Sequence, residues 1–275
     1  MRFTTLLNRS IIKISGPDNK QFLNDIATNN IFKVNASNSV YSLLLTPNGR
    51  YIYDFFLVQV ENDLLLECDS IDKNDLIAQL MLYKLHKRVK IRDCSKEYKV
   101  GVIIDRKESY CGKTCVIDEL IFISDPRNAN IGTRVIMPTL SETLFKNIDL
   151  QEYEILKMQY TVPDCNRDMK KRESFPLHFR MDEFNAIDFN KGCYVGQEVV
   201  ARMYRIGAKK KTYTIISPYN DLPTDVKEIF FQDELIGHLL FSINNMGLCI
   251  LQVDKVINYQ DVMKIGNVEV SIYKM

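Results

Sequence analysis

The sequence contains no apolar run that approaches the about 20 residues of a membrane-spanning helix. Its N-terminal segment is also too short in its apolar part for a secretory signal peptide, so we expect neither membrane insertion nor export. The net charge of the 275 residues is only +1, which removes any bulk attraction to nucleic acid or anionic lipid. With 46% hydrophobic and 26% charged residues, the composition is that of an ordinary globular protein.

Histidine and closely spaced cysteines are also scarce. The three histidines form no sequence cluster with the seven cysteines, so we expect no zinc site and no other resident metal. The odd number of scattered cysteines predicts free thiols in a reducing compartment, which would be the cytoplasm, or the mitochondrial matrix in a eukaryote. Only Cys111 and Cys115 are close, and a turn at 112–113 before a strand explains them better than a metal site. A transient contact between one cysteine and an iron–sulfur cluster stays open.

Residues 40–58 have the pattern of a β-hairpin. Two apolar runs flank Thr46–Arg50, whose Asn-Gly pair is a strong turn signal. The return run, residues 51–58, contains Asp54 among apolar neighbours. A carboxylate in this setting either faces solvent on an edge strand or is held there for a purpose.

Strand and helix patterns alternate through the first three quarters of the chain. Apolar residues recur at helical intervals in residues 72–87, 141–148 and 149–160, which predicts three helices. The last quarter contains only short β runs separated by turn residues, which predicts a small barrel or sandwich. We therefore predict an α+β fold in which residues 1–211 form a mixed region and residues 212–275 form an all-β domain.

The most informative segment is the run Lys191-Gly192-Cys193-Tyr194-Val195-Gly196-Gln197-Glu198. Glycine costs about 0.5–1 kcal/mol relative to alanine inside a helix or strand, so two glycines four residues apart indicate a backbone requirement. The residues that follow have a helix pattern, with Glu198 and Arg202 as an i,i+4 pair. The run therefore predicts a tight loop that opens into a helix, whose free N–H groups would favour an anion.

Cys193 lies in this predicted loop, beside Lys191 and a helix N-terminus. Both neighbours favour the thiolate form of a cysteine, which predicts a reactive or ligand thiol. The alternative is a small buried thiol that only fills space.

This segment, continued by Val199–Arg202 and Gly207–Lys210, resembles the signature of the YgfZ-type folate-binding proteins. That family is related to the glycine-cleavage aminomethyltransferase and takes part in iron–sulfur protein maturation. His86 stands where arginine is more usual in the family. Weaker matches follow in the family's order at Gly16–Asp18, Thr46–Arg50 with Asp54, Leu82–Leu85, Val89–Ile91, Asp125–Arg127, Phe175–Leu177, and Asp182-Glu183 with Asn185.

The resemblance implies an aminomethyltransferase-like ring of two mixed α/β subdomains and a C-terminal β-barrel around a central cavity for tetrahydrofolate or a one-carbon derivative. A pterin is a flat ring with an amide-like edge, so a buried carboxylate and aromatic walls suit it. The lysines Lys209, Lys210 and Lys211 are either solvent-exposed residues that lead into a strand or contacts for a polyglutamate tail. The resemblance assigns the shaping of the folate cavity to Lys191, Gly192, Cys193, Tyr194, Gly196, Gln197, Glu198 and Arg202.

The function that this resemblance implies is that of a tetrahydrofolate-binding accessory factor for the assembly or repair of iron–sulfur cluster proteins. Its partners would be the iron–sulfur assembly machinery or client proteins. The alternative is a one-carbon transferase in which Asp54 acts as acid/base or electrostatic stabiliser. The aminomethyltransferases carry an acidic pair where this chain has Tyr53-Asp54, which weakens the case for transfer. A folate-binding module without chemistry is the third possibility.

Overall fold

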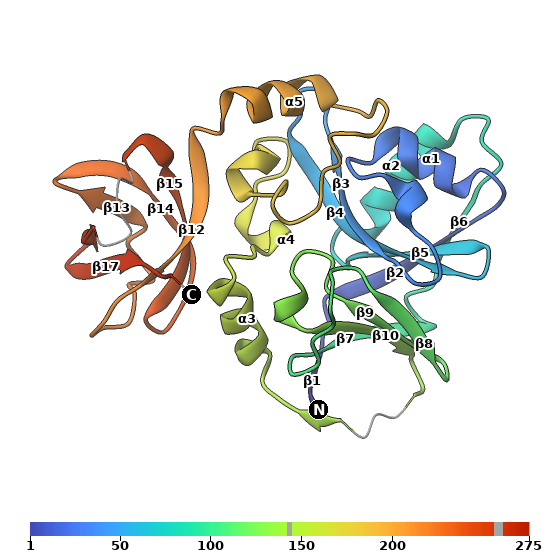
Figure 1. Ribbon diagram of the computed structural model, residues 1–275, viewed down its shortest axis with the longest axis horizontal. Helices are drawn as coiled ribbons and strands as arrows, with labels where there is room; N and C mark the ends of the chain where they lie inside the picture. Colours follow the sequence, from blue (N-terminus) through green and yellow to red (C-terminus); the bar gives the residue numbers. More distant parts are fainter. Residues whose placement is uncertain (142–144, 256–260, 275) are drawn as a thin grey trace.

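The computed structural model describes residues 1–141, 145–255 and 261–274. Within these residues the strands form two open sheets and one closed barrel. The barrel lies at one end of the molecule and the sheets at the other (Figure 1). Between them lie α3 (Leu150–Gln159), α4 (Cys165–Asp168) and α5 (Gln197–Ile206). The predicted α+β architecture with a C-terminal β-barrel is therefore confirmed.

The first sheet has the strand order β3-β4-β5-β2-β6, with antiparallel neighbours throughout. Its strands are β2 (Arg9–Ser15), β3 (Val40–Leu45), β4 (Tyr51–Val60), β5 (Asp63–Asp69) and β6 (Lys90–Asp93). The predicted hairpin is confirmed as β3 and β4. Because β4 lies between β3 and β5, Asp54 is not on an edge strand, and that interpretation of it is wrong.

Two helices cover one face of this sheet. They are α1 (Asn19–Ile26) and α2 (Lys73–Lys84), and they bury Leu23 and Leu80 in a cluster shared with the strands. The helix predicted over residues 72–87 ends early, because Leu85 adopts a positive φ of 45° that a helix cannot continue through.

The second sheet has the strand order β11-β1-β7-β10-β9-β8. Its strands are β1 (Arg2–Thr5), β7 (Tyr98–Ile103), β8 (Thr114–Ile117), β9 (Leu120–Ser124), β10 (Thr133–Pro138) and β11 (Lys146–Asn147). The helix predicted over residues 141–148 is wrong at Lys146-Asn147, which pair in parallel with β1; its residues 142–144 lie outside the described residues. The helix predicted over residues 149–160 is confirmed as α3.

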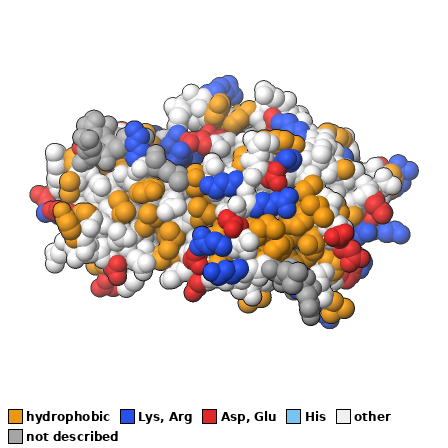
Figure 2. Space-filling view, turned by 60° about the horizontal axis from the view of Figure 1, so that its bottom comes forward, with side chains coloured by type: hydrophobic (Ala, Val, Ile, Leu, Met, Phe, Trp, Pro, Cys, Tyr) orange, Lys and Arg blue, Asp and Glu red, His pale blue; other side chains and the backbone are white. Residues whose placement is uncertain are grey.

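Apolar side chains join the two sheets. One cluster takes Ile11 and Val58 from the first sheet and Val102 and Ile136 from the second. Apolar side chains also gather on the surface, in the half of the molecule that holds the sheets, and Figure 2 shows them there with charged residues around them. No helix among the described residues is long and apolar enough to cross a membrane.

The barrel closes in the order β12-β15-β14-β13-β16-β17. Its strands are β12 (Lys210–Ile216), β13 (Glu228–Phe231), β14 (Glu234–Ile243), β15 (Met246–Gln252), β16 (Met263–Ile265) and β17 (Val268–Ile272). Apolar residues such as Ile215 and Leu251 fill its interior. Since side chains alternate along a strand, Thr214 of β12 faces outward, and its hydroxyl donates to the carbonyl of Met158 at the end of α3.

Candidate functional site

A cavity of about 400 Å³ lies where β1, β4 and β10 meet α3 and α4. Its walls combine one buried carboxylate, several cations, two aromatic rings and a thiol. These groups belong to lining residues Arg9, Asp54, Phe56, Arg127, Arg134, Tyr153, Lys157 and Cys165.

Asp54 is held in this cavity by two phenols. The hydroxyl of Tyr41 donates to Oδ2 and that of Tyr51 donates to Oδ1, each over 3.0 Å. Burial, and then the charge of Asp54, raise the pKa of both tyrosines well above the ordinary value, so both remain donors. Tyr41 also lies 3.1 Å from the sulfur of Cys165. Asp54 is only 8% exposed, and each of its oxygens keeps a lone pair for a ligand.

A chain of alternating buried charges contributes its arginines to the cavity lining. Arg9 Nε donates to Glu67 Oε1 over 2.8 Å, and Arg134 Nε donates to Glu67 Oε2 over 3.1 Å. Arg134 and Arg127 both contact Asp125, the latter over 2.7 Å. Burial alone would raise the pKa of Glu67, but the charges of Arg134 and Arg9 hold it below the ordinary value. Each charge thus depends on its neighbours, because an unpaired buried ion is strongly unfavourable.

The ring of Phe56 lies beneath the guanidinium groups of this chain. Its centroid is 4.1 Å from Arg134, 5.0 Å from Arg127 and 5.6 Å from Arg9. Arg9 is distinct among them, because its Nη2 is buried without a hydrogen-bond partner within the described residues. The cavity therefore holds one unused donor at Arg9 and an acceptor with spare capacity at Asp54.

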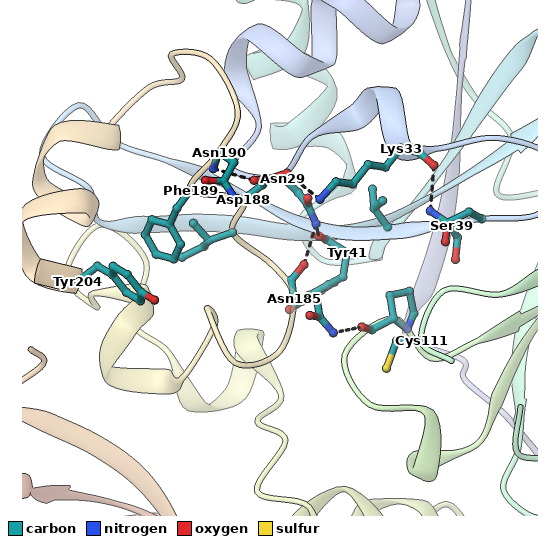
Figure 3. A pocket seen from close by; sticks show the side chains of 14 residues that line it. Asn29, Lys33, Ser39, Tyr41, Cys111, Asn185, Asp188, Phe189, Asn190 and Tyr204 are labelled. Atoms are coloured by element: carbon teal, nitrogen blue, oxygen red, sulfur yellow. Dashed lines mark hydrogen bonds and ion pairs between the residues drawn. The ribbon is translucent and has the colours of Figure 1, made fainter. Parts of the chain in front are cut away.

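A second cavity, of about 530 Å³, has Tyr41 in its lining (Figure 3). It is lined by residues of β3, the segment 185–190 and α5. The amide of Asn29 ties two walls together, donating to the carbonyls of Tyr41 and Asn185 over 2.8 and 2.7 Å. The rings of Phe189 and Tyr204 stack with centroids 4.0 Å apart.

The signature segment is a tight loop followed by α5, as predicted. Lys191 fastens it to the end of α1, because its ammonium donates to the carbonyls of Asn24, Ala27 and Asn29 over 2.6, 2.6 and 3.0 Å. Burial lowers the pKa of Lys191 to about 8, while the charges of Asp188 and Asp25 oppose that shift. The ammonium is thus engaged by backbone and does not sit against Cys193 as expected.

Only one of the two signature glycines has a visible backbone requirement. Gly196 has φ +85°, and a Cβ there would lie 2.5 Å from the carbonyl oxygen of Thr46 in the hairpin. The loop and the hairpin therefore touch backbone to backbone. Gly192 has open space around it and no positive φ, so a positive φ is not the reason for this glycine, and close approach to a bound group stays a prediction.

The remaining signature residues lie at or near the surface. Cys193 is exposed, whereas Tyr194 is buried with the Lys191 ammonium 5.3 Å from its ring centroid. Glu198 and Arg202 are both exposed, and no ion pair joins them in the described part of the chain, so the predicted pair is wrong. Gln197 is half-buried at the first turn of α5.

Neither cavity is lined by Lys191–Arg202; the nearest lining residues in the sequence are Asn190 and Tyr204. The loop's role in folate binding therefore stays a prediction. Lys209 and Lys210 are exposed, and Lys211 pairs with Glu183 over 3.1 Å, so their contact with a polyglutamate tail also stays a prediction.

The charged network was not predicted from the sequence. Glu67 and Arg134 each stand in apolar strand runs, which was the available signal for a buried ion pair. All seven cysteines are free, and no group of three His, Cys, Asp or Glu side chains among the described residues could hold a metal.

Residues 8–103 match the GCVT N-terminal domain family. The chain is 26% identical to the iron-sulfur cluster assembly factor IBA57, mitochondrial, of Homo sapiens, over 90% of this chain and 76% of that protein. Homologues of that factor in Mycosarcoma maydis and Dictyostelium discoideum are 25% and 23% identical, over 92% and 79% of this chain and 74% and 63% of theirs.

Among solved structures, the glycine cleavage system aminomethyltransferase T of Bartonella henselae superposes with a TM-score of 0.80 at 10% identity. The superposition covers all of this chain and 85% of that one. The chain therefore has the aminomethyltransferase fold, with a GCVT N-terminal domain match and sequence similarity to mitochondrial iron-sulfur cluster assembly factors.

Proposed function

We propose that this chain binds tetrahydrofolate in the cavity around Asp54 and serves as an accessory factor in the assembly or repair of iron–sulfur proteins. The observation that carries the folate part is the presence of two groups in the lining of one cavity. They are Arg9, whose buried Nη2 has no hydrogen-bond partner within the described residues, and the carboxylate of Asp54. The iron–sulfur part follows the names of the relatives.

The chemistry of the cavity suits a pterin. The amide-like edge of a pterin presents N–H donors beside a carbonyl acceptor, and Asp54 with Arg9 offers the complementary set. Phe56 and Tyr153 are the aromatic side chains in the cavity lining. A ligand acceptor at Arg9 would also satisfy a buried N–H group that otherwise costs stability.

The chain's own residues have distinct roles in this proposal. Tyr41 and Tyr51 orient Asp54, while Glu67 fixes Arg9 through its Nε and leaves Nη2 for the ligand. Tetrahydrofolate, when bound, would supply a reduced pterin that can carry a one-carbon unit. We assign no step of that chemistry to this chain.

An accessory role is favoured over one-carbon transfer by the residue next to Asp54. Where the aminomethyltransferases carry an acidic pair, this chain has Tyr53 beside Asp54. The Tyr53 side chain is buried in the apolar cluster under α1 and α2, on the opposite face of β4 from the cavity. It therefore contributes no acid or base beside the folate.

The signature loop is proposed to face the protein partner. Cys193 is exposed at the loop surface, where a thiol can reach an iron–sulfur protein without opening the fold. Lys191 and Gly196 hold the loop against α1 and the hairpin, so that Cys193 has a defined position. The partners would be assembly proteins or client iron–sulfur proteins, and the relatives' names favour a mitochondrial over a cytoplasmic location.

Two experiments test the two halves. Calorimetric titration of the full chain with tetrahydrofolate should show binding at one site, and absence of binding would refute the folate half. A strain from which the gene is deleted should lose iron–sulfur enzyme activities, and the wild-type gene should restore them. Cys193→Ser should restore them poorly; full rescue by that variant would remove Cys193 from the mechanism.

A further inference from the structure

A third cavity lies where the outer face of the barrel meets the segment that follows α3. Its volume is about 290 Å³, and most of its lining is polar. It is separate in its lining from both cavities described above. The residues that line it include Thr161, Arg180, Glu183, Lys211, Thr212 and Thr214.

The hydroxyl of Thr212 is the first sign of a ligand. Thr212 is fully buried, and its Oγ1 has no hydrogen-bond partner within the described residues. Its neighbour on the same strand face, Thr214, is satisfied by the Met158 carbonyl and by Thr161, whose Oγ1 lies 3.0 Å away. A buried hydroxyl without a partner, on a residue that lines a polar cavity, indicates that a bound ligand supplies the hydrogen-bond partner.

The second sign is a pair of cationic side chains in the wall. Arg180 Nε donates to Glu183 Oε2 over 2.9 Å, and Lys211 Nζ donates to Oε1 over 3.1 Å. Two cations thus share one carboxylate, and both keep N–H groups that these bonds do not use. Asp182 also interacts electrostatically with Lys211, so the two cations face two carboxylates, and it is the unused N–H groups of Lys211 and Arg180 that suit an anion.

The backbone around the cavity is unusual in the same place. Thr161 and Arg180 have φ of 57° and 58°, a left-handed conformation that few residues other than glycine and asparagine adopt. At Arg180 this conformation ends the 3₁₀ helix Pro176–Phe179, whose carbonyls accept from the Arg180 N–H. The signs of a ligand are therefore the orphaned hydroxyl and the two cations.

We infer that this cavity is an oxyanion subsite, which takes a carboxylate or phosphate group. The hydroxyl of Thr212 and the N–H groups of Lys211 and Arg180 would donate to the oxygens of the anion. The anion has two possible sources, a free phosphate or the glutamyl tail of a folate. The second source rests on the proposed folate function, and the first is independent of it.

The test compares thermal unfolding of the full chain in sodium phosphate and in sodium chloride at equal ionic strength. Phosphate should raise the Tm of the wild type in a saturable way. Thr212→Val keeps the shape of the side chain and removes only the hydroxyl. It should weaken the affinity for phosphate at least about tenfold without lowering the Tm in chloride.

Ser124→Ala is the matched control. Ser124 is also buried with an unpartnered hydroxyl, but it lies on β9, away from this cavity. The variant should keep the full phosphate response. Lys211→Met should weaken the phosphate response as Thr212→Val does. The conclusion then does not depend on one variant that could be misfolded.

A second arm identifies the source of the anion. Wild type and Thr212→Val are titrated with tetrahydrofolate and with its pentaglutamate. A preference of the wild type for the pentaglutamate that disappears in Thr212→Val supports the subsite and assigns it to the tail. A phosphate response without that preference supports the subsite for a free anion. The inference is overturned if the wild type shows neither effect, or if Thr212→Val keeps both, and the phosphate arm decides even if folate does not bind.

Discussion

Tyr41 donates its hydroxyl hydrogen to Oδ2 of Asp54 over 3.0 Å, while other atoms of the same side chain line the neighbouring cavity. One residue therefore lines the second cavity and also positions a carboxylate that lines the first. Because Tyr51 holds the other oxygen of Asp54, the carboxylate is fixed by two neutral donors and keeps its charge available to a ligand.

Asp54→Asn should weaken tetrahydrofolate binding by about 10- to 100-fold. The amide has no negative charge, and its NH₂ group is a donor where the carboxylate has a second acceptor oxygen. Tyr41→Phe should weaken binding less, since the phenol only orients the carboxylate. Calorimetric titration measures both, with Asp63→Asn, at the half-exposed start of β5, as the control. Equal affinity in Asp54→Asn and wild type would contradict the proposed site.

Glu67→Gln should destabilise the protein strongly. Glu67 is fully buried between Arg9 and Arg134, and removing its charge leaves two buried cations with a weak partner. The expected loss in the free energy of unfolding is about 3–5 kcal/mol, measured by urea denaturation at neutral pH. Glu97→Gln, which breaks the exposed pair with Arg92, should leave the free energy of unfolding nearly unchanged.

The same network predicts acid sensitivity. Glu67 and Asp125 have pKa values below their ordinary ones: burial alone would raise both, but the arginines outweigh it. The stability that they contribute is therefore present above the unfolded-state pKa values, about 3.8–4.5, and is lost as the pH falls through the lower native values. The free energy of unfolding should fall steeply below about pH 4 in the wild type and less steeply in Glu67→Gln.

The signature glycines should differ in their tolerance of alanine. At Gly196 a Cβ meets the Thr46 carbonyl on a backbone with positive φ, so Gly196→Ala should cost at least about 1–3 kcal/mol of stability. Gly192→Ala meets nothing within 4 Å and should be close to neutral. Urea denaturation of the two variants gives a direct comparison, and similar losses in both would contradict the contact.

Local patterns predicted the parts of the fold that local physics determines. The Asn-Gly turn, the helix after Gly196 and the short barrel strands all follow from turn chemistry and periodicity. The pairing of β11 with β1 could not be predicted in this way. The two strands lie about 140 residues apart, and the local sequence of β11 does not indicate its partner. The prediction for Cys193 was based on proximity to Lys191 in sequence, but three backbone carbonyls engage that ammonium.

The candidate site shows the same division. Asp54 was recognisable as a carboxylate inside an apolar run, whereas its donors Tyr41 and Tyr51 lie on β3 and β4 and needed the hairpin register to be found. Arg9 and Glu67 pair across β2 and β5, 58 residues apart. A sequence shows which charged residues stand in apolar strands, but the register decides which of them meet.

Lys191→Met should destabilise the loop and the end of α1 together. Three backbone carbonyls, two of them in buried hydrogen bonds, would lose a charged donor, and the expected loss is about 3 kcal/mol in the free energy of unfolding. Lys209→Met, at an exposed position beyond α5, should have little effect. Hydrogen exchange would locate the change, with faster exchange expected in α1 and the loop.

Cys193 should be the first cysteine to react with a thiol reagent. It is exposed, whereas Cys68, Cys94, Cys165 and Cys249 are buried and Cys111 and Cys115 are half-buried. Burial also raises the pKa of Cys68 to about 12, which leaves almost no thiolate near neutral pH. Iodoacetamide labelling of the folded chain, mapped by mass spectrometry, should modify Cys193 at least about tenfold faster than the buried cysteines. Cys193→Ser should remove the fast phase and leave the others unchanged, and a fast phase that persists in this variant would show that another thiol is the reactive one.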